Sequence, residues 1–335
     1  MNCMIHMFSK CGDFNTAKLI FERIKMKNCE TWNIMILSLA EHGYGVSCVE
    51  YLNKMIETTI KPDTHTFVSV LNGLSHVGKV EEGISIYNKM QSHYNIQPTY
   101  YHKTCIVDLL SRNGRLNEAE KFIQNQIEEP DITIWKTLLS SCRNFLDVER
   151  AERIAQNIFN LNDKDESTYV LLGNIYASLG MSEKLNNIRQ LMVKKGIKKT
   201  PGETWGMVNG KMVTFMANDD RHPEHQKIFL HSKQLDDHII KMGFKHNFIF
   251  AIDKKLNTEE DKIRNLCSHS ERLFISYALL NNHSPIVAYK NLRMCQNCHE
   301  ATKYISKLTK THLQIRDNSR WHHFVDGKCS CNDYY

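Results

Sequence analysis

The sequence predicts an α-solenoid of helix-turn-helix repeats followed by a smaller α/β domain. Three observations lead to this prediction. A repeat with a period near 35 residues runs through the first two hundred positions, the composition changes near residue 200, and cysteine and histidine gather after it. The chain of 335 residues is long enough for two or three domains at the usual ~100–200 residues each.

The composition excludes several classes of protein. Apolar residues make up 41% and charged residues 24% of the chain, as in an ordinary folded protein. No apolar run reaches the ~18 residues of a membrane-spanning helix, so we expect no membrane partner. Lysine and arginine exceed aspartate and glutamate by 43 to 37, a formal net charge of +6. This mild excess permits a nucleic-acid partner without demanding one.

Glycine turns and prolines mark the repeats. The spacing from Gly43 to Gly78 is 35 residues, and from Gly78 to Gly114 it is 36. Each unit shows an apolar helix, a glycine turn and a second helix, and Pro62 and Pro98 stop two of the units. Paired helices with this period form a solenoid, because each unit can bury its apolar face only against its neighbours.

The repeat pattern continues with less regularity toward residue 200. We expect about three units within 1–130, the first of them truncated, and two divergent units within 131–200. Gly180 lies 66 residues after Gly114, close to two periods, so the divergent stretch keeps the spacing. Aromatic positions such as Trp32 are expected to be solenoid core and nothing more.

A second domain is predicted at 201–335. The basic linker before it ends in turn residues, and Asn209-Gly210 then lies between two apolar runs. This is the strongest short signal for a β-hairpin, because both central residues of a type I′ turn need positive φ. An apolar helix over 273–280 follows. A strand, a helix and another strand within 285–316 then make a βαβ unit, which indicates an α/β domain.

Cysteine and histidine are concentrated in this second domain. From residue 222 onward lie five of the eleven cysteines and eleven of the seventeen histidines. The cysteine count is odd and no secretory signal precedes it, which disfavours a disulfide framework. Metal ligation is the better explanation of such a cluster.

A first candidate metal site combines two short motifs. His-Ser-Glu at 269–271 stands 24 residues before Cys-Gln-Asn-Cys at 295–298. The cysteine pair alone fits a structural zinc clip or a redox pair equally well. Together, and in this order, the motifs match the zinc nucleoside-deaminase signature, in which the glutamate is not a ligand. The metal ligands are then His269, Cys295 and Cys298, and the general acid and base is Glu271.

The chemistry of deamination requires these residue types. Three protein ligands leave the fourth tetrahedral position for water, whose pKa zinc lowers from 15.7 to about 7. Hydroxide attacks the ring carbon that bears the amine, and Glu271 carries the proton to the ring nitrogen. Residues two apart on a helix diverge by about 200°, so His269 and Glu271 could not share a metal from mid-helix. We therefore predict a helix break near Ser268.

The two halves resemble known families. Residues 32–63 resemble pentatricopeptide repeats of the mixed-length plant type (PLS class), and 169–177 resembles the E motif of such proteins. The region after Pro201 resembles the DYW domain, a cytidine deaminase, on four elements, and the resemblance covers essentially the whole chain. These elements are His222-Pro223, His269-Ser270-Glu271, Lys290-Asn291-Leu292-Arg293 and the tail from Trp321 to Cys331.

Three positions depart from the family pattern. Tyr335 replaces the final tryptophan, Asn297 replaces the usual aspartate between the two cysteines, and Met294 stands where other zinc deaminases carry proline. None of these changes removes a ligand. An aromatic side chain is retained at the end of the chain.

The resemblance implies a second, structural zinc. The residues that fit it are His299, His322, Cys329 and Cys331. His322 is preferred over its neighbour His323, which is the second choice. The competing interpretation of this group is a pair of ordinary reduced thiols.

The resemblance also implies base recognition by the repeats, with two positions per repeat specifying one RNA base. Here the pairs are Asn2 with Asn28 and Asn33 with Asp63, both favouring pyrimidines and the second favouring uracil. Three repeats could specify only about three bases. A longer repeat protein, or editing factors acting in trans, is therefore a further expected partner beside single-stranded RNA.

The predicted architecture is thus an α-solenoid followed by an α/β zinc cytidine-deaminase-like domain. The predicted function is site-specific editing of organelle transcripts by hydrolytic deamination of cytidine to uridine. In a competing hypothesis the chain is an RNA-binding scaffold whose zinc domain has no catalytic role, and in a third it is a zinc-dependent RNA hydrolase.

The family implies a mitochondrial or plastid location, of which the mitochondrion is preferred. The chain begins inside a helical pattern with no transit-type leader ahead of it. We expect either that the protein is not imported or that this N-terminus is incomplete.

Overall fold

The computed structural model describes residues 1–248 and 258–334, so Tyr335 lies outside the described residues. The chain divides into two compact units, built on Met1–Lys199 and Thr200–Asn332. None of the helices within the described ranges is long and apolar enough to cross a membrane.

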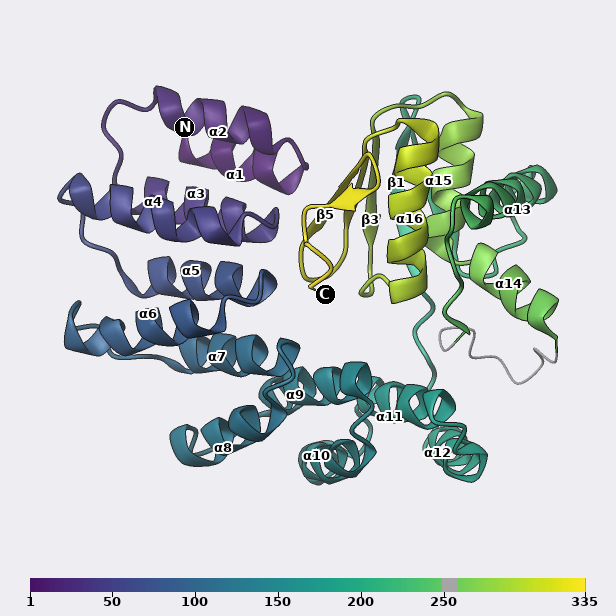
Figure 1. Ribbon diagram of the computed structural model, residues 1–335, viewed down its shortest axis with the longest axis horizontal. Helices are drawn as coiled ribbons and strands as arrows, with labels where there is room; N and C mark the ends of the chain where they lie inside the picture. Colours follow the sequence, from purple (N-terminus) through teal and green to yellow (C-terminus); the bar gives the residue numbers. More distant parts are fainter. Residues whose placement is uncertain (249–257, 335) are drawn as a thin grey trace. The chain divides into compact units, whose positions relative to one another are not determined.

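The first unit is a solenoid of helix pairs (Figure 1). The first helix of each pair packs against the first helix of the next, and the second helix packs on its partner. Trp32 and Phe67 are buried in the continuous apolar core, as expected. The pairs are α1 (Asn2–Lys10) with α2 (Phe14–Arg23), α3 (Cys29–Glu41) with α4 (Gly45–Glu57), α5 (Thr64–His76) with α6 (Val80–Ser92), α7 (Tyr100–Arg112) with α8 (Leu116–Gln126), α9 (Ile132–Phe145) with α10 (Val148–Leu161), and α11 (Glu166–Ser178) with α12 (Ser182–Lys194).

The stretch 1–130, expected to hold about three repeats, holds four helix pairs. The additional pair is α7 with α8. The first helix of this pair begins with Tyr-Tyr-His-Lys-Thr, so its apolar pattern is weaker than that of α3 or α5. Its turn at Gly114 has positive φ, like the other glycine turns of the solenoid.

The turn between α9 and α10 explains the double spacing between Gly114 and Gly180. Both glycines have positive φ, at 75° and 67°. The turn midway between them is formed by Leu146, whose φ is 55°. The left-handed conformation is disfavoured for a residue with a β-carbon, which is why glycine usually occupies such turns. The repeat is therefore present although its marker residue is not.

The second unit is a mixed sheet with helices packed on it. The strand order is β2-β1-β3-β4-β5-β6, in which β3 and β4 are parallel and the other neighbours antiparallel. In Figure 1, helices α13, α15 and α16 lie on the same side of this sheet. The strands are β1 (Glu203–Val208), β2 (Lys211–Met216), β3 (Ile286–Lys290), β4 (Leu313–Arg316), β5 (Trp321–Val325) and β6 (Lys328–Cys329), and the helices are α13 (His225–Lys241), α14 (Glu259–Cys267), α15 (Ser270–Leu280) and α16 (Gln296–Thr309).

Local signals placed these elements correctly. The predicted hairpin joins β1 to β2, with Asn209 and Gly210 at φ 48° and 78°. The predicted βαβ unit is β3, α16 and β4. Because β3 and α16 follow each other directly, the turn between them delivers the cysteine motif to the start of a helix.

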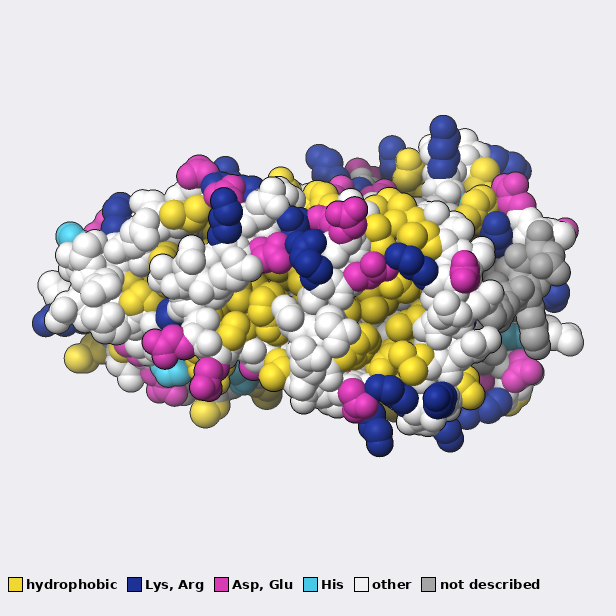
Figure 2. All heavy atoms as spheres, turned by 90° about the horizontal axis from the view of Figure 1, so that it is seen from below, with side chains coloured by type: hydrophobic (Ala, Val, Ile, Leu, Met, Phe, Trp, Pro, Cys, Tyr) yellow, Lys and Arg dark blue, Asp and Glu magenta, His cyan; other side chains and the backbone are white. Residues whose placement is uncertain are grey.

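The surface seen in Figure 2 carries mixed charge. Lysine and arginine side chains are interspersed with aspartate and glutamate, and apolar side chains show between them. As far as its described side chains go, that face is not the uniformly basic surface that follows a phosphate backbone.

Candidate metal centres and nucleic-acid interface

A helix interruption positions the first cluster. Helix α14 ends at Cys267, Ser268 is its C-cap, and His269 is the N-cap of α15. The predicted break near Ser268 is therefore present, and His269 has extended backbone angles of φ −64° and ψ 144°. This geometry lets His269 and Glu271 approach one point although they are two residues apart. Cys267, the last residue of α14, is fully buried.

The two cysteines of the first cluster lie at the N-terminus of α16. Cys295 is the N-cap, and its sulfur accepts a hydrogen bond from the backbone N–H of Cys298 at 3.4 Å. A hydrogen bond from Cys298 and the nearby His269 lower the pKa of the Cys295 thiol well below its usual value. All eleven cysteines lie in the described residues and are free thiols, so the pair is not a disulfide.

The donor geometry of the first cluster fits zinc. His269 Nδ1 lies 3.5 Å from Cys295 Sγ and 3.3 Å from Cys298 Sγ. Tetrahedral zinc with bonds of about 2.3 Å to sulfur and about 2.0 Å to nitrogen holds these atoms about 3.5 Å apart. A carboxylate oxygen of Glu271 is within 4.8 Å of the same atoms. The structure thus brings all four predicted residues together.

Glu271 is a buried carboxylate with an ammonium partner. Its side chain is 1% exposed, and its Oε2 accepts hydrogen bonds from Lys290 Nζ at 2.8 Å and Ser270 Oγ at 3.2 Å. Lys290 also donates to Ser270 Oγ at 3.0 Å. Burial by itself would raise the pKa of the Glu271 carboxyl, but Lys290 and His269 outweigh it and lower that pKa to about 2. Glu271 is therefore an anion at neutral pH.

Lys290 was not among the site residues predicted from the sequence. A signal was available, because alternate residues of a strand face the same side and Lys290 follows Ile286 and Ala288 in that register. All three are buried. A lysine at a core-facing position needs a buried anion nearby, since such residues are almost never fully buried unless paired.

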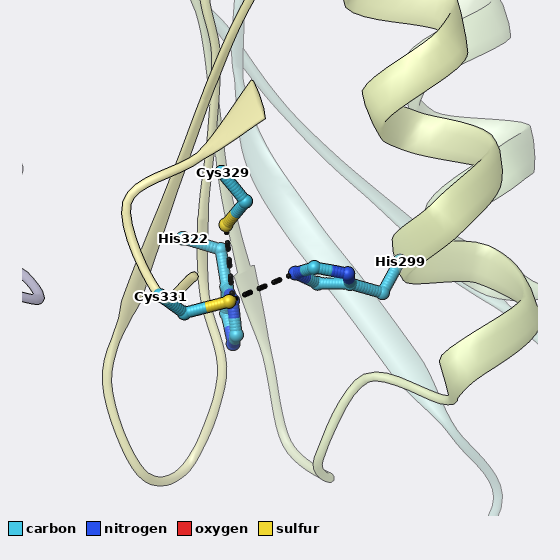
Figure 3. Close-up of side chains that lie close together, drawn as sticks. All are labelled: His299, His322, Cys329 and Cys331. Atoms are coloured by element: carbon cyan, nitrogen blue, oxygen red, sulfur yellow. Dashed lines mark hydrogen bonds between the residues drawn. The ribbon is translucent and has the colours of Figure 1, made fainter. Parts of the chain in front are cut away.

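The second cluster gathers the four residues that were predicted for it (Figure 3). His299 extends from α16 toward Cys329, Cys331 and His322, which come from the last strands and the segment after them. His322 Nδ1 lies 3.6 Å from Cys329 Sγ, and His299 Nε2 lies 3.2 Å from Cys331 Sγ. These spacings also suit tetrahedral zinc. His323 is not in the cluster.

Asp317 supports the second cluster from behind. Its Oδ2 lies 3.3 Å from His322 Nε2, which leaves Nδ1 of that ring facing the sulfurs. Its Oδ1 accepts backbone N–H bonds from Ser319 at 2.8 Å and Arg320 at 3.0 Å. Burial opposes ionisation of Asp317, but His322 and the backbone donors outweigh it and lower the pKa of this carboxyl. A carboxylate behind a histidine ligand fixes its tautomer and orientation.

The Asp317 carboxylate also accepts a hydrogen bond from Met294, the residue that stands where other zinc deaminases carry proline. The backbone N–H of Met294 donates to Asp317 Oδ2 at 3.3 Å. Proline has no N–H and could not make this bond. Asp317 thereby connects the residue before Cys295 to His322, so one buried anion supports both clusters.

A second buried ion pair lies next to Glu271 in the sequence. Arg272 Nη2 donates to Asp236 Oδ1 at 2.8 Å, and His246 Nε2 lies 2.8 Å from the other oxygen of that carboxylate. Asn297 is also buried here, and its Oδ1 accepts the backbone N–H of Asn247 at 2.9 Å. These contacts tie α13 and the segment after it to α15 and α16.

The predicted base-recognition residues lie together in the solenoid. Asn33 Nδ2 donates to both carboxylate oxygens of Asp63, at 3.0 and 3.1 Å. Asn2 and Asn28 are connected through the Thr31 hydroxyl, which is 2.9 Å from Asn2 Oδ1 and 2.7 Å from Asn28 Oδ1. Each predicted pair is therefore one local cluster of polar atoms.

These positions also have a structural role that the sequence analysis missed. Asn28 and Asp63 are the N-caps of α3 and α5. Asn33 is the fifth residue of α3, and Lys136 is the fifth residue of α9. Lys136 forms an ion pair at 3.2 Å with Asp165, the N-cap of α11, just as Asn33 bonds to the N-cap of α5. The divergent repeats thus keep a contact between these two positions, but an ion pair replaces the hydrogen bond between an amide and a carboxylate.

The fold and the two clusters together define a helical-repeat protein that carries an α/β domain with two possible metal sites. Family models agree in detail. Pentatricopeptide repeats match residues 1–29, 30–58 and 65–94, the E motif matches 145–206, and the DYW family of nucleic acid deaminases matches 243–335. The chain therefore belongs to the pentatricopeptide repeat proteins with an E motif and a DYW deaminase-family domain.

Curated relatives from Arabidopsis thaliana match nearly the whole chain. A putative pentatricopeptide repeat-containing protein is 38% identical over 335 residues, covering 99% of this chain and 40% of its own length. The chloroplastic proteins DOT4 and ELI1 are 36% and 37% identical, covering 100% and 99% of this chain and 38% and 53% of their own lengths. The chain thus spans about half or less of the length of each of these relatives.

Among solved structures, the maize pentatricopeptide repeat protein PPR10 shares the fold. The TM-score is 0.51 at 14% identity, over 91% of this chain and 46% of that one.

Proposed function

We propose that the protein edits organelle RNA by zinc-dependent hydrolytic deamination of cytidine to uridine. The observation that supports this most directly is the buried carboxylate of Glu271. It lies within 4.8 Å of a donor set of one imidazole and two thiols. A purely structural zinc site needs four ligands and no proton carrier, whereas three nitrogen and sulfur ligands with a separate carboxylate suit hydrolysis.

Each residue has a distinct task in this proposal. His269, Cys295 and Cys298 hold the zinc, which when bound acts as a Lewis acid that activates water at neutral pH. Glu271, held as an anion, accepts the proton of the attacking water and passes it to the ring nitrogen of cytidine. Glu271 would then carry the second proton of that water to the exocyclic amine, so that the carbon–nitrogen bond breaks, ammonia leaves and the base in the RNA is uridine. His299, His322, Cys329 and Cys331 hold a second zinc with a structural role.

The repeats are proposed to bind the single-stranded RNA around the target. The pair Asn2 with Asn28 offers two amide groups to a base edge, and the pair Asn33 with Asp63 offers an amide and a carboxylate, as in one-base-per-repeat recognition. A single-stranded substrate spares the enzyme the unstacking cost, about a few kcal/mol, of extracting a base from a duplex. The names of relatives such as DOT4 and ELI1 include the word chloroplastic, which supports a location of this protein in an organelle. That organelle is either the plastid or the mitochondrion.

The test replaces Glu271 with alanine. We expect uridine formation in single-stranded organelle transcripts to fall by about 10²–10⁴-fold, the usual contribution of a general acid and base. The zinc content should stay the same, because the nitrogen and sulfur ligands are untouched. Glu260→Ala is the matched control, since this glutamate side chain is 83% exposed on α14.

Two results would count against the proposal. Unchanged editing by Glu271→Ala would remove the role given to this carboxylate. A zinc-loaded wild type that forms no uridine in any of these transcripts, while still binding them, would favour the scaffold hypothesis.

A further inference from the structure

The carboxylate of Glu271 lies close enough to the first cluster to be a metal ligand itself. One of its oxygens is within 4.8 Å of His269 and both sulfurs, and the side chain is buried away from water. Carboxylate oxygen is an ordinary zinc ligand in proteins. If Glu271 bound the metal, the donor set would be complete, and neither an open position nor a proton acceptor would remain. Some contact must keep this carboxylate off the metal.

Lys290 is placed to make that contact. Its ammonium is 2.8 Å from Glu271 Oε2, and the Ser270 hydroxyl donates to the same oxygen at 3.2 Å. The lysine is on a central strand, β3, whose pairing with β1 sets Lys290 opposite Thr204. Thr204 Oγ1 in turn lies 2.9 Å from Ser270 Oγ. The position of the ammonium is therefore fixed by the sheet and not by a mobile loop.

Gly202 lies beside the Lys290 ammonium. A β-carbon on Gly202 would lie 3.3 Å from Lys290 Nζ, closer than most real contacts of that kind. The lysine side chain is 6% exposed, so solvent does not compete for the carboxylate. An ammonium and a metal ion attract the same anion, and the nearer, preorganised partner retains it.

We propose that Lys290 is a positioning residue that binds the Glu271 carboxylate and thereby keeps it out of the metal coordination shell. This inference deepens the proposed function and rests on its assignment of His269, Cys295 and Cys298 as ligands. It makes the charge of Lys290 essential. A role in packing alone would require only its size and shape.

The test uses cobalt(II) in place of zinc, because cobalt takes similar sites and its visible absorption reports its ligands. Azide is the probe of the open position. In the wild-type protein, added azide should change the cobalt spectrum at the first cluster, whereas the second cluster already has four protein ligands. In Lys290→Met the freed carboxylate should occupy the open position and weaken azide binding by about 10–100-fold, the usual effect of removing a group that orients a metal site.

Three further variants make the result specific. The double variant Lys290→Met with Glu271→Ala should regain azide binding, because the competing carboxylate is gone. Lys290→Arg should keep wild-type azide binding, because the positive charge remains. Lys227→Met is the control, since Lys227 forms an exposed ion pair with Glu224 at 3.2 Å.

The proposal would be overturned if Lys290→Met bound azide with the wild-type affinity. It would also be overturned if the double variant bound azide as weakly as Lys290→Met does. If Lys290→Met does not fold, Lys290→Gln provides the same comparison, because the amide keeps a hydrogen-bond donor and loses the charge. Weaker azide binding by this variant supports the proposal, and unchanged binding overturns it. The experiment needs no RNA, so a protein that passes it and yet forms no uridine refutes the proposed function alone.

Discussion

The two clusters both combine cysteine with histidine and each takes a residue from α16, but they differ in where their carboxylate lies. Cys298 and His299 are neighbours on α16 and belong to different clusters. In the first cluster Glu271 is beside the donor atoms, bound to Lys290. In the second, Asp317 lies behind His322, and four nitrogen and sulfur donors complete the set.

This difference is the one expected between a catalytic and a structural zinc site. Structural sites are closed by four protein ligands, whereas catalytic sites keep one position open. The supporting anion follows the same division. Beside an open site it can move a proton, and behind a ligand it can only orient an imidazole. Four experiments would test this contrast.

The largest effect is expected from removing one thiolate from each cluster in turn. Cys331→Ser should lose the second zinc and unfold the α/β unit, because binding free energy at a structural zinc site, about 10–16 kcal/mol at pH 7, is folding free energy. Cys298→Ser should lose one zinc and leave that unit folded. Zinc content per chain and circular dichroism during heating measure both. Equal destabilisation by the two variants would contradict the division into open and closed sites.

The next effect concerns the buried pair beside the first cluster. Asp236→Asn leaves the Arg272 guanidinium, 1% exposed, without its anion and should cost about 3–5 kcal/mol of unfolding free energy. Burial raises the pKa of Asp236, but His246 and Arg272 outweigh it and lower that pKa below its ordinary value. The stabilisation is therefore complete above the unfolded pKa of about 3.9 and is lost as pH falls through the lower folded value.

Chemical denaturation at several pH values measures this contribution. The wild-type protein should lose stability below about pH 4, and Asp236→Asn should lose less over the same interval, because one of the responsible carboxylates is absent. A variant with wild-type stability at pH 7 would show that the pair contributes nothing net.

A smaller effect is expected at the anion behind the second cluster. In Asp317→Asn the amide must direct its NH₂ group either at the backbone N–H groups of Ser319 and Arg320 or at the side of Met294 and His322, so one set of donors loses its acceptor. Zinc affinity at the second cluster should fall by about 10–100-fold. Competition with a chelator measures the affinity of each of the two zinc ions. If only the zinc of the first cluster is bound more weakly, the assignment of Asp317 to the second cluster is wrong.

The smallest effect is expected at Met294. Proline at this position removes the N–H that bonds to Asp317, and a typical intramolecular hydrogen bond contributes about 0.5–1.5 kcal/mol. Beyond the loss of the buried Met294 side chain, Met294→Pro should therefore lower stability by this amount, and it should leave the zinc content unchanged. Met294→Leu, which keeps the N–H, is the control. Equal stability of the two variants would show that the hydrogen bond is not the reason for methionine here.

Much of the second unit follows from local signals. Asn209-Gly210 placed the hairpin, because only a few residues tolerate positive φ, and the spacing of His269 and Glu271 required the break at Ser268. The solenoid was equally legible until Leu146, where an uncommon left-handed leucine replaced the glycine that marks the turn. The fourth helix pair was marked in the sequence mainly by its turn at Gly114, because α7 begins with a polar stretch.

The partners of the buried charged residues could not be predicted from local sequence signals. Lys290 meets Glu271 across 19 residues of sequence, and Asp236 meets Arg272 across 36. Periodicity shows which residues face the core, but the identity of a buried partner depends on strand order and on how a helix lies against the sheet. The sequence by itself determined the repeats, the strand-helix-strand unit and the candidate ligands, since local backbone preferences and short motifs carry them. Only the tertiary structure decided which carboxylate lies beside the donor atoms of its cluster and which lies behind a histidine, because side chains far apart in the sequence make these contacts.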